Sequence, residues 1–119
     1  MNILIVDDAA FARLALRKIV EEGGHTVVAE ASDGFKALEE YKLYKPELVL
    51  MDITMPECNG IESLKMIKAY DPNMKAIVCS SMGQQDYIVD AVQSGAKDFI
   101  VKPYNAERLL DSIKKVGGR

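Results

Sequence analysis

Short apolar runs and helix-like patterns alternate along the 119 residues of the chain. Continuous runs of apolar and β-branched residues indicate strands, whereas apolar residues three or four positions apart indicate helices. The expected strands are residues 2–6, 26–31, 48–51, 76–79 and 99–101. The expected helices are residues 10–22, a segment that opens at Ser32-Asp33-Gly34 and ends before Pro46, and residues 61–70, 85–94 and 106–116.

Four of the expected helices carry apolar residues at helical spacing, and Gly23, Pro46 and Gly95 are expected to end the first, second and fourth of them. We expect these apolar residues to mark the inward faces. They are Phe11, Leu14, Ile19 and Val20 in the first helix, Ala37, Leu38 and Tyr41 in the second, Leu64, Ile67 and Ala69 in the third, and Ile88, Ala91 and Val92 in the fourth.

Five strand and helix pairs in strict alternation predict an α/β fold. Parallel neighbours need right-handed crossover connections, so the helices should cover both faces of one doubly wound, five-stranded parallel sheet. The short, wholly apolar strands fit a sheet that is buried on both sides. The chain is therefore expected to form a single (βα)5 domain over residues 1–119.

Composition narrows the classes of function. Fifteen Lys and Arg against eighteen Asp and Glu give a net charge of -3, so direct nucleic-acid binding is not expected. Apolar runs are far shorter than the roughly 20 residues of a membrane helix, and the start of the chain lacks a charged leader. We therefore expect a cytoplasmic protein with no membrane association. Cys58 and Cys79 cannot form a disulfide framework and are expected to be reduced thiols.

Chemically active side chains follow four of the five expected strands. They are Asp7-Asp8, Asp52, Ser80-Ser81 and Lys102-Pro103. In open α/β sheets, ligands bind beyond the carboxyl ends of the strands, where the strand order reverses. These residues are therefore expected to converge on one site.

The three aspartates indicate a cation site. If the first and third strands are neighbours, about 4.8 Å apart, each carboxylate pair costs about 3 kcal/mol at an effective dielectric near 20. A Mg²⁺ ion with oxygen ligands relieves this repulsion, and no His or Cys nearby favours zinc. The alternative is that Asp7 and Asp8 merely cap the first helix.

Lys102 and Ser80 supply what an anionic ligand needs. An ammonium group pairs with a phosphoryl oxygen and a hydroxyl donates to another, while a carboxylate can itself accept a phosphoryl group. The set therefore indicates phosphoryl transfer. Alternatively, Lys102 is a solvated surface lysine and Ser80 a turn serine. Pro103 either ends the strand or forms a cis bond that directs the lysine inward.

Four segments carry a resemblance to a known family. They are LIVDD at 4–8, MDITMPECNG at 51–60, CSSMGQQ at 79–85 and GAKDFIVKP at 95–103. In this order and spacing, the chain resembles the response-regulator receiver domains of bacterial two-component signalling, and in particular their stand-alone chemotaxis members. The resemblance covers nearly the whole chain and implies a flavodoxin-like sheet with strand order 2-1-3-4-5.

The resemblance also implies the roles of the acidic residues. Asp52 would accept a phosphoryl group from a phosphohistidine on a sensor histidine kinase. Asp7 and Asp8 would hold Mg²⁺ together with Asp52 and the main-chain carbonyl of Thr54. The chain would be a signalling protein, with at most self-phosphorylation from small donors and slow autodephosphorylation.

The resemblance further implies a switch. Ser80 would move toward the phosphoryl group, Lys102 would pair with it, and Phe99 would be the aromatic that turns inward. By itself, a strand aromatic such as Phe99 more often packs in a core. A partner such as the flagellar motor switch would then bind the surface formed by the fourth helix, fifth strand and fifth helix. The protein would be a monomer, and a phosphatase would remove its phosphoryl group.

Some positions depart from common receiver patterns. The switch is a serine instead of a threonine, and Tyr104 replaces a frequent phenylalanine and adds a hydroxyl. Ser81 keeps a small residue beside the site. Thr54 and Met82 stand where receivers tune the lifetime of the aspartyl phosphate.

Three other functions use similar parts. A Mg²⁺-dependent phosphohydrolase usually has its nucleophilic Asp on the first strand with a second acid two residues later, whereas Asp7 and Asp8 are adjacent and the proposed acceptor is on the third strand. A flavin carrier of this architecture would meet repulsion between Asp7-Asp8 and a phosphate. The receiver half of a transcription factor is the third alternative.

Overall fold

The computed structural model describes residues 1–53, 55, 58–81 and 85–117. The strands are β1 (Asn2–Val6), β2 (Thr26–Ala31), β3 (Leu48–Asp52), β4 (Ala76–Ser80) and β5 (Asp98–Val101). The helices are α1 (Ala10–Glu22), α2 (Gly34–Tyr44), α3 (Gly60–Tyr70), α4 (Gln85–Gln93) and α5 (Ala106–Val116). The alternation expected from the sequence is confirmed, with small differences at the ends of elements.

The five strands form one parallel sheet in the order β2-β1-β3-β4-β5. The doubly wound α/β fold and its 2-1-3-4-5 order are thus confirmed. Strand order reverses at β1, which pairs with β2 on one side and with β3 on the other. The carboxyl ends of β1 and β3 therefore lie side by side at the position where this class of sheet binds ligands.

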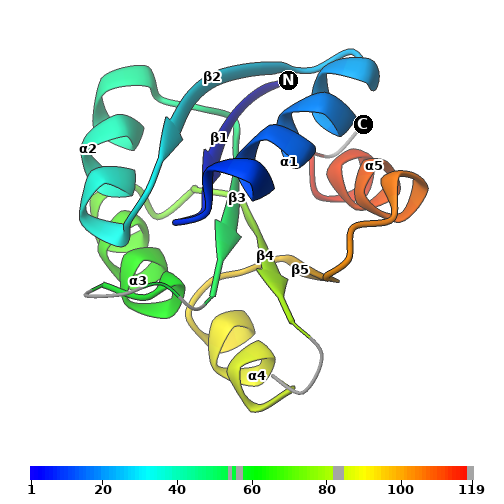
Figure 1. Ribbon diagram of the computed structural model, residues 1–119. Helices are drawn as coiled ribbons and strands as arrows, with labels where there is room; N and C mark the ends of the chain where they lie inside the picture. Colours follow the sequence, from blue (N-terminus) through cyan, green and yellow to red (C-terminus); the bar gives the residue numbers. More distant parts are fainter. Residues whose placement is uncertain (54, 56–57, 82–84, 118–119) are drawn as a thin grey trace.

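Helices cover both faces of the sheet (Figure 1): α1 and α5 lie together on one face, and α2, α3 and α4 lie on the other. Successive strand residues alternate between the two faces, because Ile3 and Ile5 pack toward α1 and α5 whereas Leu4 and Val6 pack toward α2 and α3. The two cores hold the sheet in place and fix the direction of each residue at its carboxyl edge.

The expected inward faces are right for some helices and wrong for others. In α2, Ala37 and Tyr41 are buried as expected. In α1, Val20 is buried as expected, whereas Phe11 and Leu14 are 79% and 66% exposed and Ala12 and Leu16 are buried in their place. Apolar residues stand on two sides of this helix, so spacing alone did not show that Phe11 and Leu14 lie on the exposed side.

Two further residues expected to point inward are exposed. Val92 of α4 is 51% exposed and Ala69 of α3 is also exposed. Helix α4 is anchored through the buried Ala91 and the partly buried Ile88. Of the helices in the described ranges, none is long and apolar enough to cross a lipid bilayer. Cys58 and Cys79 are buried free thiols, as expected.

Candidate functional site

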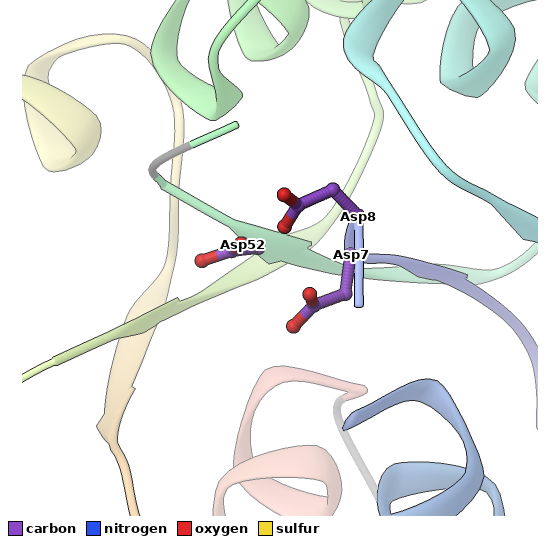
Figure 2. A group of neighbouring side chains, drawn as sticks. All are labelled: Asp7, Asp8 and Asp52. Atoms are coloured by element: carbon purple, nitrogen blue, oxygen red, sulfur yellow. The ribbon is translucent and has the colours of Figure 1, made fainter. Parts of the chain in front are cut away.

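Three carboxylates gather at the carboxyl edge of the sheet. Asp7 and Asp8 directly follow β1, and Asp52 is the last residue of β3. One carboxylate oxygen from each residue lies within 4.8 Å of those of the other two. Figure 2 shows the three side chains extending to the same side of the strand ends. Asp7 and Asp52 are buried, at 1% and 4% exposure, whereas Asp8 is exposed.

The backbone around Asp7 is held by its neighbours. The Asp7 amide donates to Ala31 O, and the guanidinium of Arg13 donates to Asp7 O at 2.6 Å. Arg13 also donates to the Glu30 carboxylate on β2 at 3.0 Å, and this ion pair holds the guanidinium in position beside Asp7. The capping alternative receives little support, because α1 begins after Ala9 without a side-chain cap and Asp7 Oδ1 accepts only from the Ala9 amide at 2.9 Å.

Asp52 is positioned by β3 and by a glycine that passes close to it. Asp52 pairs with Cys79 of β4, so the two residues are neighbours in the sheet. A Cβ atom at Gly60 would collide with the carbonyl oxygen of Asp52. Glycine at the start of α3 therefore lets that helix begin directly against the end of β3.

Lys102 extends into this acidic group. Its Nζ lies 3.1 Å from Asp7 Oδ2 and 3.5 Å from Asp52 Oδ1. Burial alone would lower the pKa of Lys102, but the carboxylates of Asp52 and Asp7 outweigh burial and raise it. The interpretation of Lys102 as a solvated surface residue is therefore wrong. The Lys102–Pro103 peptide bond is cis, and β5 ends at Val101.

Ser80 and Phe99 occupy different surroundings. Ser80 ends β4, so it is not a turn serine; it is fully buried, and its Oγ has no hydrogen-bond partner in the described part of the chain. Phe99 of β5 is 36% exposed, so the interpretation that it packs in the core is wrong. Thr54 and Met82 lie outside the described residues.

The charges of this group do not balance. Among the described residues, three clustered carboxylates have one lysine beside them, because Lys102 contacts the buried Asp7 and Asp52 and the exposed Asp8 lies next to both. At 4.8 Å and an effective dielectric near 20, each carboxylate pair costs about 3 kcal/mol. This group suits a hard divalent cation, because it offers oxygen ligands and excess negative charge. Asp8 is exposed, so the cation can keep some of its waters. The residues present therefore fit Mg²⁺.

Two neighbours of the site were not identified from the sequence as parts of it. Burial raises the pKa of the Cys79 thiol to about 12, with Asp52 and Asp7 adding to the rise, so this thiol stays protonated and unreactive. The Tyr104 hydroxyl is buried near it. The sequence signal was weak, because it consists only of a polar residue two positions after Lys102.

The comparisons with known proteins agree with this geometry. The family described as "Response regulator receiver domain" matches residues 3–114. The chain is 53% identical over 115 residues to the chemotaxis protein CheY of Thermotoga maritima, covering 97% of this chain and 96% of that protein. It is 56% identical over 114 residues to CheY of Bacillus subtilis, covering 96% and 95% of the two chains.

A solved structure is also similar over nearly the whole chain. The structure of the CheX–CheY complex with BeF3 and magnesium from Borrelia burgdorferi superposes with a TM-score of 0.92 at 36% identity, covering 98% of this chain and 88% of that chain. These relatives favour neither a phosphohydrolase nor part of a transcription factor. The chain belongs to the response regulator receiver domain family, in which it is a phosphorylation-dependent signalling protein of the chemotaxis type.

Proposed function

We propose that residues 1–119 act as one receiver domain in which Asp52 accepts a phosphoryl group from a sensor histidine kinase. The observation that carries this proposal is the position of the Asp52 carboxylate. It is 4% exposed, lies beside Asp7 and Asp8, and has Lys102 Nζ at 3.5 Å. An acceptor oxygen, a cation site and a fixed ammonium group thus meet at one point.

Mg²⁺ is the proposed cofactor. Asp7, Asp8 and Asp52 would hold it together with the main-chain carbonyl of Thr54, although Thr54 lies outside the described residues. The bound ion neutralises charge on the transferring phosphoryl oxygens. The B. burgdorferi complex contains magnesium and BeF3, a stand-in for a phosphoryl group, which supports this assignment.

In the proposed transfer, one bond to phosphorus forms as another breaks. An oxygen of Asp52 forms a bond to phosphorus while the bond from phosphorus to the donor's imidazole nitrogen breaks and the imidazole keeps the electron pair. Lys102 holds positive charge beside the oxygens that carry the transferred charge. Small phosphoryl donors would react in the same way, and water would slowly hydrolyse the aspartyl phosphate.

The proposed output is a change in the surface formed by α4, β5 and α5. A phosphoryl group adds charge and acceptor oxygens, which would draw the Ser80 hydroxyl toward Asp52 and let Phe99 turn inward. This surface already exposes apolar side chains: Tyr87, Val89, Val92, Phe99 and Val101. Exposed apolar residues suit a protein partner, and we propose that this partner is the flagellar motor switch. We further propose that the protein is a cytoplasmic monomer and that a phosphatase, of the kind suggested by CheX, removes its phosphoryl group.

Labelling with acetyl phosphate and Mg²⁺, followed by peptide mapping, tests the acceptor. We expect one acid-stable, base-labile phosphoryl group on Asp52, absent in Asp52→Asn and absent when the metal is chelated. Asp111→Asn is the matched control, because Asp111 is an exposed carboxylate on α5 and not one of the three clustered aspartates, and this variant should label normally. Labelling on another residue, or labelling that ignores the metal, would contradict the proposal.

A further inference from the structure

Tyr104 carries a buried hydroxyl for which the described part of the chain offers no hydrogen bond. Its Oη and Ser80 Oγ are the buried side-chain oxygens or nitrogens without a partner in the described ranges of the chain. Buried polar groups in folded proteins are nearly always bonded, because leaving a donor unpaired is costly. An unpaired hydroxyl beside a site that binds a ligand therefore requires an explanation.

The position of Tyr104 links it to the phosphoryl site. Tyr104, Lys102, Ser81 and Ala9 contribute to the lining of one cavity of about 730 Å³ beside α1. The remaining wall is apolar and includes Ala12. The cavity therefore reaches from the side chain that contacts Asp7 and Asp52 to the tyrosine.

The hydroxyl of Tyr104 also stays a donor at ordinary pH. Burial raises its pKa, and the nearby Cys79, Asp7 and Asp52 raise it further. Cys79 is a polar neighbour of the hydroxyl, but a thiol is a weak hydrogen-bond partner. Within the described residues, no contact of the hydroxyl has the distance and angles of a hydrogen bond. The Tyr104 hydroxyl is thus a protonated hydrogen-bond donor close enough to Asp7 and Asp52 to be affected by their charges.

We propose that Tyr104 is a further binding residue of the Asp52 site. Its hydroxyl has no hydrogen-bond partner among the described residues of the unphosphorylated protein and donates to an oxygen of the site when Mg²⁺ and a phosphoryl group are bound. Phosphorylation supplies new acceptor oxygens, which is what this donor lacks. The inference rests on the proposed function, because it requires a phosphoryl group at Asp52.

Thermal unfolding of the full chain, titrated with beryllofluoride at saturating Mg²⁺, tests the inference. Tyr104→Phe removes only the hydroxyl, so the free variant should unfold at the same or a higher temperature than the wild type. Its affinity for beryllofluoride should fall about three- to tenfold, the loss of one neutral hydrogen bond. The matched control is Tyr44→Phe, since Tyr44 is 50% exposed at the end of α2, and it should match the wild type in both respects.

Each other outcome has a definite meaning. Wild-type affinity in Tyr104→Phe, or equal losses of stability in its free and bound states, would overturn the inference and leave the proposed function intact. No stabilisation of the wild type by beryllofluoride and Mg²⁺, or equal stabilisation of Asp52→Asn, would contradict the proposed function and this inference with it.

Discussion

Two groups of acidic residues in this protein differ in how far nearby donors and cations compensate their negative charge. Asp98, at the start of β5, is 9% exposed and accepts from both terminal nitrogens of Arg108 at 3.2 Å, from Ser112 Oγ at 2.6 Å and from the Phe99 amide at 2.8 Å. Asp7 and Asp52 instead share Lys102, at 3.1 and 3.5 Å, and an oxygen of the exposed Asp8 lies within 4.8 Å of theirs.

The difference separates a structural carboxylate from a ligand-binding group. Both carboxylate oxygens of Asp98 accept hydrogen bonds from donors on α5 and β5, so its charge is compensated without a bound cation. The group at the carboxyl edge keeps an excess of negative charge that a cation can relieve. Within the described residues, Asp98 is the other buried carboxylate, and its charge is compensated by its own neighbours.

The largest expected effect comes from breaking the balanced group. Asp98→Asn replaces an acceptor with an amide that opposes the donors of Arg108 and Ser112, so we expect a loss of about 2–4 kcal/mol in the free energy of unfolding. Urea unfolding measures it. Asp111→Asn, an exposed change on α5, should shift stability by less than about 0.5 kcal/mol.

A smaller effect is expected from acid. Burial alone would raise the pKa of Asp98, but the hydrogen bonds from Arg108, Ser112 and the Phe99 amide outweigh it and lower the pKa. Its stabilisation is therefore present above the ordinary carboxyl pKa of about 4 and is lost as pH falls through the lower folded value. Unfolding curves between pH 6 and about pH 2 should fall less steeply in Asp98→Asn than in the wild type. Parallel curves would show that Asp98 does not drive the acid response.

The smallest effect should follow Arg108→Lys. A lysine keeps the charge but cannot bond both oxygens of Asp98 in a fork. Because the Arg108 side chain is 47% exposed, solvent screens part of the interaction, and we expect a loss of about 1 kcal/mol in unfolding free energy. A loss as large as that of Asp98→Asn would mean that the guanidinium geometry carries the whole network.

Most of the fold was predictable because the strands are short, mostly apolar and separated by clear stops such as Gly23 and Pro46. The faces of α1 were not, because Phe11 and Leu14 also stand at helical spacing yet remain exposed. Spacing shows that a helix has apolar residues, whereas the sheet that it covers decides which of them are buried.

The acidic residues and Lys102 were predictable for a related reason. Each directly follows a strand, and the parallel topology brings the strand ends to one edge. The support from Arg13 and the burial of the Tyr104 hydroxyl were not predictable, since both depend on which side chains from distant segments pack together. The strand order itself was implied by family resemblance.

Unfolding of the wild type and Asp52→Asn, with and without Mg²⁺, tests the unbalanced cluster most directly. Without the metal, Asp52→Asn should be more stable by about 1–3 kcal/mol, because it removes one of three like charges while Lys102 keeps its contact with Asp7. Added Mg²⁺ should stabilise the wild type and leave the variant nearly unchanged. A wild type that does not respond to Mg²⁺, or a variant that gains as much as the wild type, would contradict the assignment of this cluster as the cation site.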